Sequence, residues 1–263
     1  MGTLTDTIEG VVSGTPFERP ARWLYSELSS IGRPRARQSR GYDRLTVQIM
    51  SSVLEPSSCC VDAGAHRGGM LLHMAELAPQ GQIFAFEPLP DLAGRLRKRW
   101  QGSSHVQVFD LALSDSSGTQ TFHEVVDSPG KSSFRRMGHV APGARVREIP
   151  VRTARLDDVV PPETRIRFIK VDVEGAQLEV FRGARRILSR DQPFIVFEHG
   201  MLAQEGYGTT SDMIYDLLVD ECGLEISLLS DWLSRRPCLT RDQLNGHVGH
   251  HATSHFCFLA HPV

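Results

Sequence analysis

Short apolar runs alternate with helical stretches from residue 59 onward, and this alternation constrains the fold more than any other feature of the sequence. The runs cover residues 59–61, 83–86, 106–109, 168–171 and 194–197, and the helical stretches between them cover 70–78, 91–100 and 176–189. Strands that are apolar at almost every position are typical of a parallel sheet with helices on both faces. Right-handed connections then predict a doubly wound α/β fold.

Two regions depart from this alternation. Residues 115–152 hold strand-like runs at 121–125 and 148–151, and predict an inserted β excursion with a mobile loop at 130–133. Near the C-terminus, the apolar runs at 224–229 and 256–259 predict a closing antiparallel pair. We therefore expect an N-terminal extension over residues 1–45 and one domain over 46–263. The domain should begin with an amphipathic helix at 46–54.

Composition narrows the functional classes. The formal net charge is −2, so no global field would recruit nucleic acid or an anionic membrane. The five cysteines form no CxxC pair, which argues against a zinc knuckle and against a disulfide framework. No N-terminal signal and no stretch long enough to cross a bilayer stand out, so the cytoplasm is the expected location.

A glycine-rich turn at residues 61–69 follows the first strand-like run. Glycine lets backbone approach a ligand closely, and free amides at a helix start bind anionic groups. The spacing is not the G-x-G-x-x-G of dinucleotide enzymes, because His66 stands where the second glycine should be. The turn predicts a ligand site that involves Asp62, Gly64, His66 and Gly68, and the alternative is a plain strand-to-helix turn.

Glu87 follows the second strand-like run and precedes Pro88. A carboxylate at this position, about 20 residues after a glycine-rich turn, is where a ribose diol is held in many α/β folds. Its oxygens can accept hydrogen bonds from both hydroxyls of the sugar. The alternative is an exposed glutamate at the end of a strand.

Charged side chains also end the later strands. Lys170, Asp172 and Glu174 alternate and would share one face of an extended strand. Such charges are costly unless they are paired or used, so the alternatives are an ion pair with Lys170 and a role in a site. Glu198 and His199 end the next strand and are candidates for acid–base chemistry. A structural histidine is the alternative there.

Four histidines lie close together in the sequence near the C-terminus, which raises the question of a metal site. They are His247, His250, His251 and His255. Their spacing fits neither a helix face nor a zinc finger, and we expect no metal.

Taken together, the motifs resemble the FkbM family of methyltransferases. The resemblance covers about residues 57–200 and rests on residues 61–68, 86–88, 153–158 and 169–176. The family usually has Asn where His66 stands and Glu where Gln177 stands. The resemblance implies a Rossmann-like class I methyltransferase fold, S-adenosyl-L-methionine as cofactor, and O-methylation of a hydroxyl. Family members typically act on sugars, glycolipid glycans or polyketide-type natural products.

The resemblance also suggests roles within the cofactor site. The turn from Gly64 to Gly68 would hold the methionine part, Glu87 the ribose, and Asp110 to Ala112 the adenine edge. Asp110 could equally be a surface carboxylate at a strand end. Asp172 is a further candidate for cofactor binding.

The reaction expected is in-line transfer of the methyl group to a hydroxyl, with placement of the two reactants supplying much of the rate. His199 is the first candidate for the base, because a neutral imidazole accepts a proton near pH 7. Glu198 or Asp172 could orient the His199 ring. Asp172 is the second candidate for the base, with Glu174 as the like-charged neighbour that could make it basic enough. A mechanism without a strong base stays open.

The expected partner is a small-molecule or glycan acceptor, with neither nucleic acid nor integral membrane association, and a homodimer stays open. Three other functions remain as alternatives: a nicotinamide-dependent oxidoreductase, a nucleic-acid methyltransferase and a binding-only protein. The missing G-x-G-x-x-G argues against the first. Net acidity and the lack of a base-flipping motif argue against the second. The charged strand ends disfavour the third.

Overall fold

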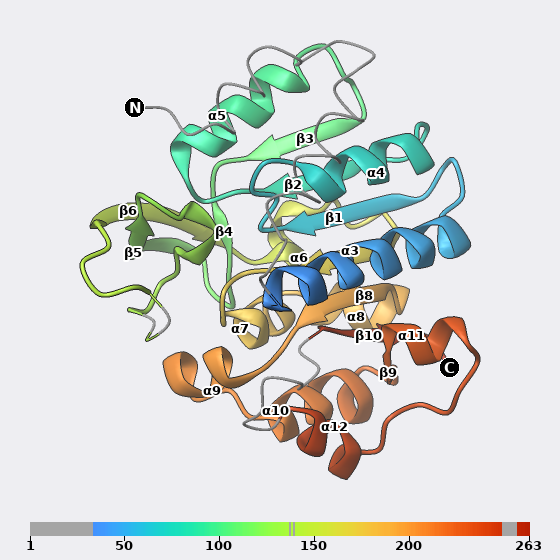
Figure 1. Ribbon diagram of the computed structural model, residues 1–263. Helices are drawn as coiled ribbons and strands as arrows, with labels where there is room; N and C mark the ends of the chain where they lie inside the picture. The colour runs from blue at the N-terminus through green and yellow to red at the C-terminus, as the bar shows by residue number, and fades with distance from the viewer. Residues whose placement is uncertain (1–33, 137, 139, 249–256) are drawn as a thin grey trace. The chain divides into compact units, whose positions relative to one another are not determined.

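A seven-stranded sheet forms the centre of the computed structural model, which describes residues 34–136, 138, 140–248 and 257–263 (Figure 1). In sheet order its strands are β3 (Val106–Phe109), β2 (Ile83–Phe86), β1 (Cys59–Ala63), β7 (Ile166–Val171), β8 (Phe194–Glu198), β10 (Cys257–His261) and β9 (Glu225–Leu228). All neighbours are parallel except β10, which is antiparallel to both β8 and β9. The predicted mostly parallel sheet with an antiparallel C-terminal pair is confirmed.

The strand order reverses direction between β1 and β7. After β1 and β2 the chain forms α4 (Gly69–Leu77) and α5 (Pro90–Arg99), and after β7 it forms α7 (Gln177–Arg182) and α8 (Arg185–Asp191). Right-handed crossovers on the two sides of a reversal place their helices on opposite faces, and Figure 1 shows α4 in front of the sheet and α8 behind it. Such a reversal leaves a crevice at the carboxyl ends of the two central strands.

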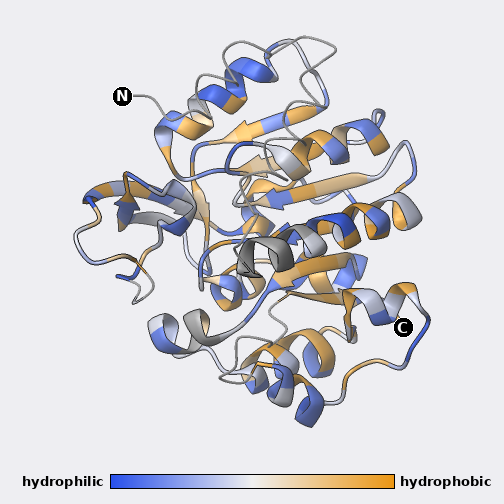
Figure 2. Cartoon of the chain, in the orientation of Figure 1, coloured by the Kyte–Doolittle hydropathy of each residue, from blue (hydrophilic) through white to orange (hydrophobic). Residues whose placement is uncertain are grey.

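The core lies between the sheet and these helices. Figure 2 shows β1, β3 and β8 as largely hydrophobic, whereas α5 carries a hydrophilic side. Phe84, Phe86, Phe168 and Phe197 are among the largest fully buried side chains. Strands buried on both faces explain why the sequence is continuously apolar at these positions instead of alternating.

Two helices differ from the sequence prediction. Helix α3 (Pro34–Val53) begins at Pro34 rather than near residue 46, and proline is favoured at a first helical position. The single helix expected over 176–189 is divided into α7 and α8 around Gly183. A Cβ on Gly183 would lie 2.0 Å from the carbonyl oxygen of Ser114, so this close backbone approach requires glycine. The expectation for residues 1–33 lies outside the described residues.

A second, three-stranded sheet has the order β4 (Ala112–Leu113), β6 (Val146–Ala154) and β5 (Gly118–Val125). Residues 130–133, which the sequence predicts to be a mobile loop, carry most of the short helical turn η1 (Pro129–Lys131) and form hydrogen bonds with β5. The Ser132 hydroxyl oxygen accepts a hydrogen bond from the Val125 amide at 2.9 Å. Ser133 and His123 exchange backbone hydrogen bonds of 2.9 and 3.2 Å. The periodicity of the sequence could not predict these contacts, because each one joins residues on different elements.

The remaining elements pack around the C-terminal strands. They are α9 (Met201–Tyr207), α10 (Ser211–Tyr215), the π-helical turn η2 (Asp216–Glu221), α11 (Leu229–Leu233) and α12 (Arg241–His247). Residues 45–263 form one compact unit. Within the described ranges, none of the helices combines the length and the apolar character needed to cross a membrane.

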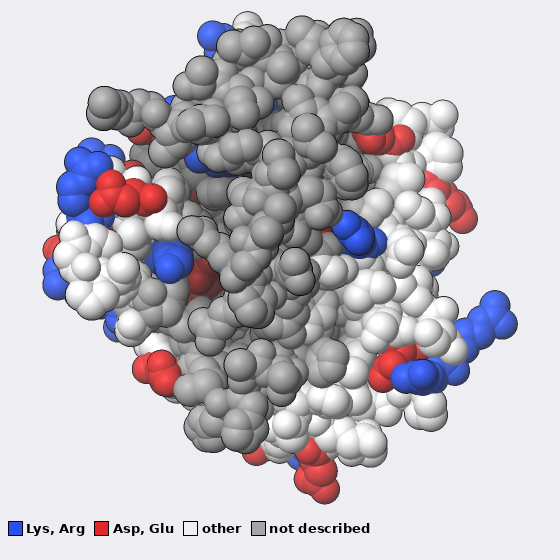
Figure 3. Space-filling model, viewed as in Figure 1, with Lys and Arg blue, Asp and Glu red and all other residues white. Residues whose placement is uncertain are grey.

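Surface charges are mixed rather than gathered by sign. Over the described part of the face in Figure 3, Lys and Arg lie next to Asp and Glu, for example where the small sheet projects. Arg145 contacts Asp127 at 2.7 Å and Arg147 contacts Glu124 at 2.6 Å. Exposed pairs of this kind contribute little to stability, so the sheet depends on its apolar face.

Asp157 caps the start of α8, the second of the two helices on either side of Gly183. It lies in α6 (Leu156–Val159), and its carboxylate oxygens accept hydrogen bonds from the amides of Arg186 and Ile187 at 2.8 and 3.1 Å. These are amides of the first turn of α8, which have no partner within their own helix. Asp157 therefore acts as a capping group from a distant part of the chain.

We expect Asp157→Ala to lower the free energy of unfolding by about 1–2 kcal/mol, because two helix-end amides lose their acceptor. Urea denaturation monitored by circular dichroism measures this change. The matched control is Asp158→Ala, since Asp158 is exposed and accepts only a 3.4 Å hydrogen bond from Ser117. Equal stability of the two variants would contradict the capping role.

Candidate active site

A pocket opens at the carboxyl ends of β1, β2 and β7, where the strand order reverses. The turn after β1 contributes Gly64 and His66, and the turn after β2 contributes Glu87. Asp172 and Glu174 enter from the end of β7. Three segments that are far apart in the sequence thus meet, as expected for a doubly wound sheet.

Gly64 lies against the end of β7. Its φ angle is +82°, and a Cβ at this position would lie 1.9 Å from the carbonyl oxygen of Asp172. The Gly64 amide donates to the carbonyl of Phe86 at 3.0 Å. Only glycine allows the chain to turn here while it stays bound to β2 and touches β7.

Glu87 is buried at the bottom of the pocket, with 4% of its surface exposed. Its two carboxylate oxygens accept hydrogen bonds from the amides of His66 at 2.7 Å and Leu89 at 2.9 Å. Burial raises the pKa of Glu87 to about 7, although these two amides act in the opposite direction. Each oxygen keeps a second lone pair that a ligand hydroxyl can use.

A charged cluster lies beside Glu87, between β1 and β7. The Lys170 ammonium contacts the Asp172 carboxylate at 2.9 Å, so the predicted ion pair is present. Burial would lower the pKa of Lys170, but Asp172 and Asp62 outweigh it and hold that pKa above its ordinary value.

Asp62 lies behind the pocket and is fully buried on β1. Within the described structure neither of its carboxyl oxygens has a hydrogen-bond partner. Burial raises the pKa of Asp62 to about 6, against the attraction of Lys170. Asp62 does not line the pocket, so it acts on the site through charge.

Glu174 has an uncommon backbone conformation at the pocket wall, with φ of +49°. Burial, followed by repulsion from Asp172, raises its pKa to about 8, while Lys131 and Lys170 act in the opposite direction. From the sequence, Asp172 is the carboxylate candidate for the base, and Glu174 is the neighbour that could make it basic enough. In the structure Glu174 itself lines the pocket and has the raised pKa.

The small sheet and the segment after β5 close the pocket with apolar side chains. Phe122 and Phe134 meet edge to face with ring centres 5.0 Å apart, and both line the pocket. Leu111 and Ala112 line it from the end of β3. Sequence reasoning found Ala112 but missed the two phenylalanines, because only the folded β excursion brings them to this position.

Two proposed site residues lie outside the pocket. Asp110 forms ion pairs with Arg97 at 3.2 Å and Arg152 at 2.6 Å, and these hold its pKa below the ordinary value despite some desolvation. Of its two proposed roles, the geometry favours the surface carboxylate. Gly68 has φ of +78° and precedes α4, where a Cβ would meet Leu96 at 2.7 Å. Glycine at this position allows α4 to pack closely against Leu96.

His199 is not positioned as the base that the sequence suggested. It is 1% exposed, its Nε2 lies 3.1 Å from the Ser211 hydroxyl, and it does not line the pocket. Burial lowers the pKa of His199 to about 4, which makes the ring a weak base. Glu198 also lies outside the pocket lining and contributes negative charge near Lys170. Strand position alone could not show which way these side chains face.

Of the histidines near the C-terminus, His250, His251 and His255 lie outside the described residues, so their role stays a prediction. His247 ends α12.

The fold and this crevice define a Rossmann-like ligand-binding enzyme, and comparison with known proteins gives its class. The family model described as the methyltransferase FkbM domain matches residues 62–226, which is more than half of the chain. The chain therefore belongs to the FkbM methyltransferase family. The expected enzyme class, an S-adenosylmethionine-dependent methyltransferase, is confirmed.

Two curated relatives are similar to part of this chain. 2-O-methyltransferase NoeI of Sinorhizobium fredii is 30% identical over 164 residues, which are 58% of this chain and 67% of that protein. Methyltransferase sdnD of Sordaria araneosa is 33% identical over 152 residues, 47% of this chain and 59% of that one. A solved FkbM methyltransferase from Methylobacillus flagellatus is 17% identical, with a TM-score of 0.48 over 79% of this chain and 44% of that one.

The raised pKa of Glu174 has a measurable consequence for stability. Between about pH 4.5 and 8 the unfolded chain releases the Glu174 proton while the folded chain retains it. This contribution therefore makes the free energy of unfolding fall as pH rises through that range, by at most about 1.4 kcal/mol per pH unit. We expect Glu174→Gln to remove it, so the variant should gain stability relative to wild type from pH 5 to pH 8.

Urea denaturation at unit pH steps measures this difference. The control is Glu163→Gln, because Glu163 is an exposed glutamate outside the pocket. A difference between Glu174→Gln and wild type that does not change with pH would contradict the raised pKa.

Proposed function

We propose that the chain transfers a methyl group from S-adenosylmethionine to a hydroxyl of a small molecule, a sugar or a glycolipid, within the pocket at the strand reversal. The observation that carries this proposal is the convergence of Glu87, Asp172 and Glu174 at one crevice of an FkbM-family sheet. When bound, the cofactor supplies a methyl group attached to a positively charged sulfur.

The pocket residues fit this cofactor. Glu87 is held in place by two backbone amides and has lone pairs left for the ribose hydroxyls. Leu89 and Leu111 offer apolar walls for a flat base. The carboxylates of Asp62, Asp172 and Glu174 all lie close enough to Lys170 to interact with it. Their combined negative charge favours a cationic ligand over a phosphate.

Glu174 is the group best placed to take the proton of the acceptor hydroxyl. It lines the pocket, and its raised pKa makes its carboxylate a stronger base than an ordinary glutamate. Asp172 is held as the partner of Lys170, which suits it for positioning charge. His199 is buried against Ser211 and is not needed for this mechanism.

The class of acceptor rests on the relatives and on the pocket walls. One relative is named as a 2-O-methyltransferase, which supports a hydroxyl acceptor. Phe122 and Phe134 form an apolar wall of the kind against which sugar rings and polyketides pack. Incubation with methyl-labelled S-adenosylmethionine and fractionated glycans, glycolipids and small metabolites tests the proposal. If folded protein that binds the cofactor transfers label to none of these fractions, the proposal is contradicted.

We expect Glu87→Gln to weaken binding of S-adenosylhomocysteine by about one to two decades, because a charged acceptor is lost. Isothermal titration calorimetry measures the affinity. The matched control is Asp110→Asn, which removes a carboxylate outside the pocket and should bind as wild type does. Equal loss in both variants would overturn the assignment of Glu87.

We expect Glu174→Gln to slow single-turnover methyl transfer by about 10² to 10⁴ while cofactor affinity holds. In wild type the rate should rise with pH and level off near pH 8, since Glu174 must lose its proton to act. The comparison variant is His199→Ala, for which we expect less than a tenfold loss. A larger loss in His199→Ala than in Glu174→Gln would return the role of base to the histidine.

A further inference from the structure

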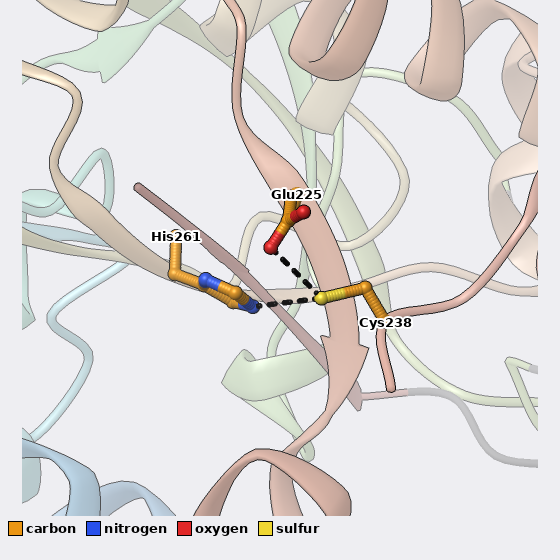
Figure 4. A group of neighbouring side chains, drawn as sticks. All are labelled: Glu225, Cys238 and His261. Atoms are coloured by element: carbon orange, nitrogen blue, oxygen red, sulfur yellow. Dashed lines mark hydrogen bonds between the residues drawn. The ribbon is translucent and has the colours of Figure 1, made fainter. Parts of the chain in front are cut away.

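Three side chains with different metal-ligating chemistry converge far from the pocket. Glu225, Cys238 and His261 each offer one ligand atom, and these atoms all lie within 4.8 Å of one another. Figure 4 shows the three side chains pointing toward a common centre, with the Cys238 sulfur between the other two. Neither the methyl-transfer site nor the histidines noted in the sequence account for this group.

The backbone holds all three residues in place. Glu225 and His261 are directly paired across β9 and β10. The amide of Leu239 donates to the carbonyl of Ile226 at 2.7 Å, which fixes the segment after α11 against β9 and places Cys238 beside Glu225. Ligands on rigid elements keep their geometry without further ordering, which favours metal binding.

The donor atoms are oriented as metal ligands are. The Nδ1–H of His261 donates to the carbonyl oxygen of Pro262 at 2.8 Å, which leaves the lone pair of a neutral ring on Nε2. That nitrogen lies 3.8 Å from the Cys238 sulfur, and the sulfur lies 3.0 Å from the Glu225 carboxylate. A backbone carbonyl on the outer nitrogen is the usual support of a metal-bound histidine.

The spacing suits a tetrahedral ion. Usual Zn–S and Zn–N bond lengths place neighbouring ligand atoms about 3.5 Å apart, close to the observed sulfur–nitrogen separation. We propose that Glu225, Cys238 and His261 form a binding site for Zn²⁺, with solvent as the fourth ligand. A thiolate, an imidazole and a carboxylate together favour zinc over magnesium or calcium. The partly exposed Glu225 and Cys238 leave a path for the ion.

Without metal the same groups form a hydrogen-bonded thiol. The Cys238 S–H donates to the Glu225 carboxylate. Binding of zinc forms the Zn–S bond and releases the thiol proton to solvent. The Glu225 carboxylate then binds the cation in place of the Cys238 S–H. The Ser227 hydroxyl, 3.0 Å from Nε2, turns its proton away when the ion takes that lone pair.

The position of the site indicates a structural role. Glu225 is the first residue of β9 and His261 is the last residue of the antiparallel β10, so both lie at the amino-terminal edge of the sheet. The pocket lies at the opposite, carboxyl-terminal edge. Zinc would therefore join β9, β10 and the segment that carries Cys238, and would stabilise the C-terminal strands without entering the methyl-transfer reaction.

The test uses full-length protein stripped with a chelator and then reloaded with zinc chloride. We expect one tightly bound zinc per chain by elemental analysis, and a melting temperature that rises with zinc concentration. Cys238→Ser should weaken zinc binding by more than the roughly 10- to 100-fold that loss of a supporting residue costs. Cys59→Ser removes a cysteine on β1 and should bind zinc as wild type does.

Cobalt substitution keeps the test independent of variant stability. Wild-type protein loaded with Co²⁺ should show a sulfur-to-cobalt charge-transfer band, which Cys238→Ser lacks and Cys59→Ser retains. Absence of that band in folded wild type would overturn the proposal. Zinc binding of equal strength in wild type and Cys238→Ser would overturn it as well, because the metal would then lie elsewhere.

Discussion

The close contact between the turn after β1 and the end of β7 organises the whole site. Gly64 lies against the carbonyl of Asp172, and the Asp172 amide donates to the carbonyl of Ala63 at 3.0 Å. The same turn donates to Phe86 at the end of β2. These contacts bring the ends of three strands to one point, and any side chain at Gly64 would force them apart. The pocket exists because this approach is tight.

The close approach of the strand ends also concentrates negative charge at the pocket. Strand ends that meet closely bring Asp62, Glu87, Asp172 and Glu174 near Lys170. Lys170, and Lys131 beside Glu174, do not offset the cost of burying these carboxylates, so burial holds the pKa of Asp62, Glu87 and Glu174 above ordinary values. A cationic ligand in the crevice would relieve this imbalance. Ligand binding and the protonation state of the pocket are therefore coupled.

The β excursion gives this chain's pocket an apolar wall that a doubly wound sheet alone would lack. Phe122 comes from β5 and Phe134 from the segment after it, and the Phe134 amide donates to the Tyr207 hydroxyl at 3.2 Å. That hydrogen bond joins the excursion to α9, which follows β8 and His199 in the chain. The wall over the crevice therefore depends on elements from both halves of the domain.

The sheet, the turn at Gly64 and the carboxylates at the strand ends can be predicted from the sequence. Apolar periodicity, the presence of glycine and position at a strand end are all local properties of the chain. The local sequence does not show that His199 turns toward Ser211, that Arg97 and Arg152 pair with Asp110, or that burial raises the pKa of Glu174. Nor could it bring Glu225, Cys238 and His261 together. Burial, side-chain direction and neighbouring charges depend on residues that are distant in the chain, so they become defined when the chain folds.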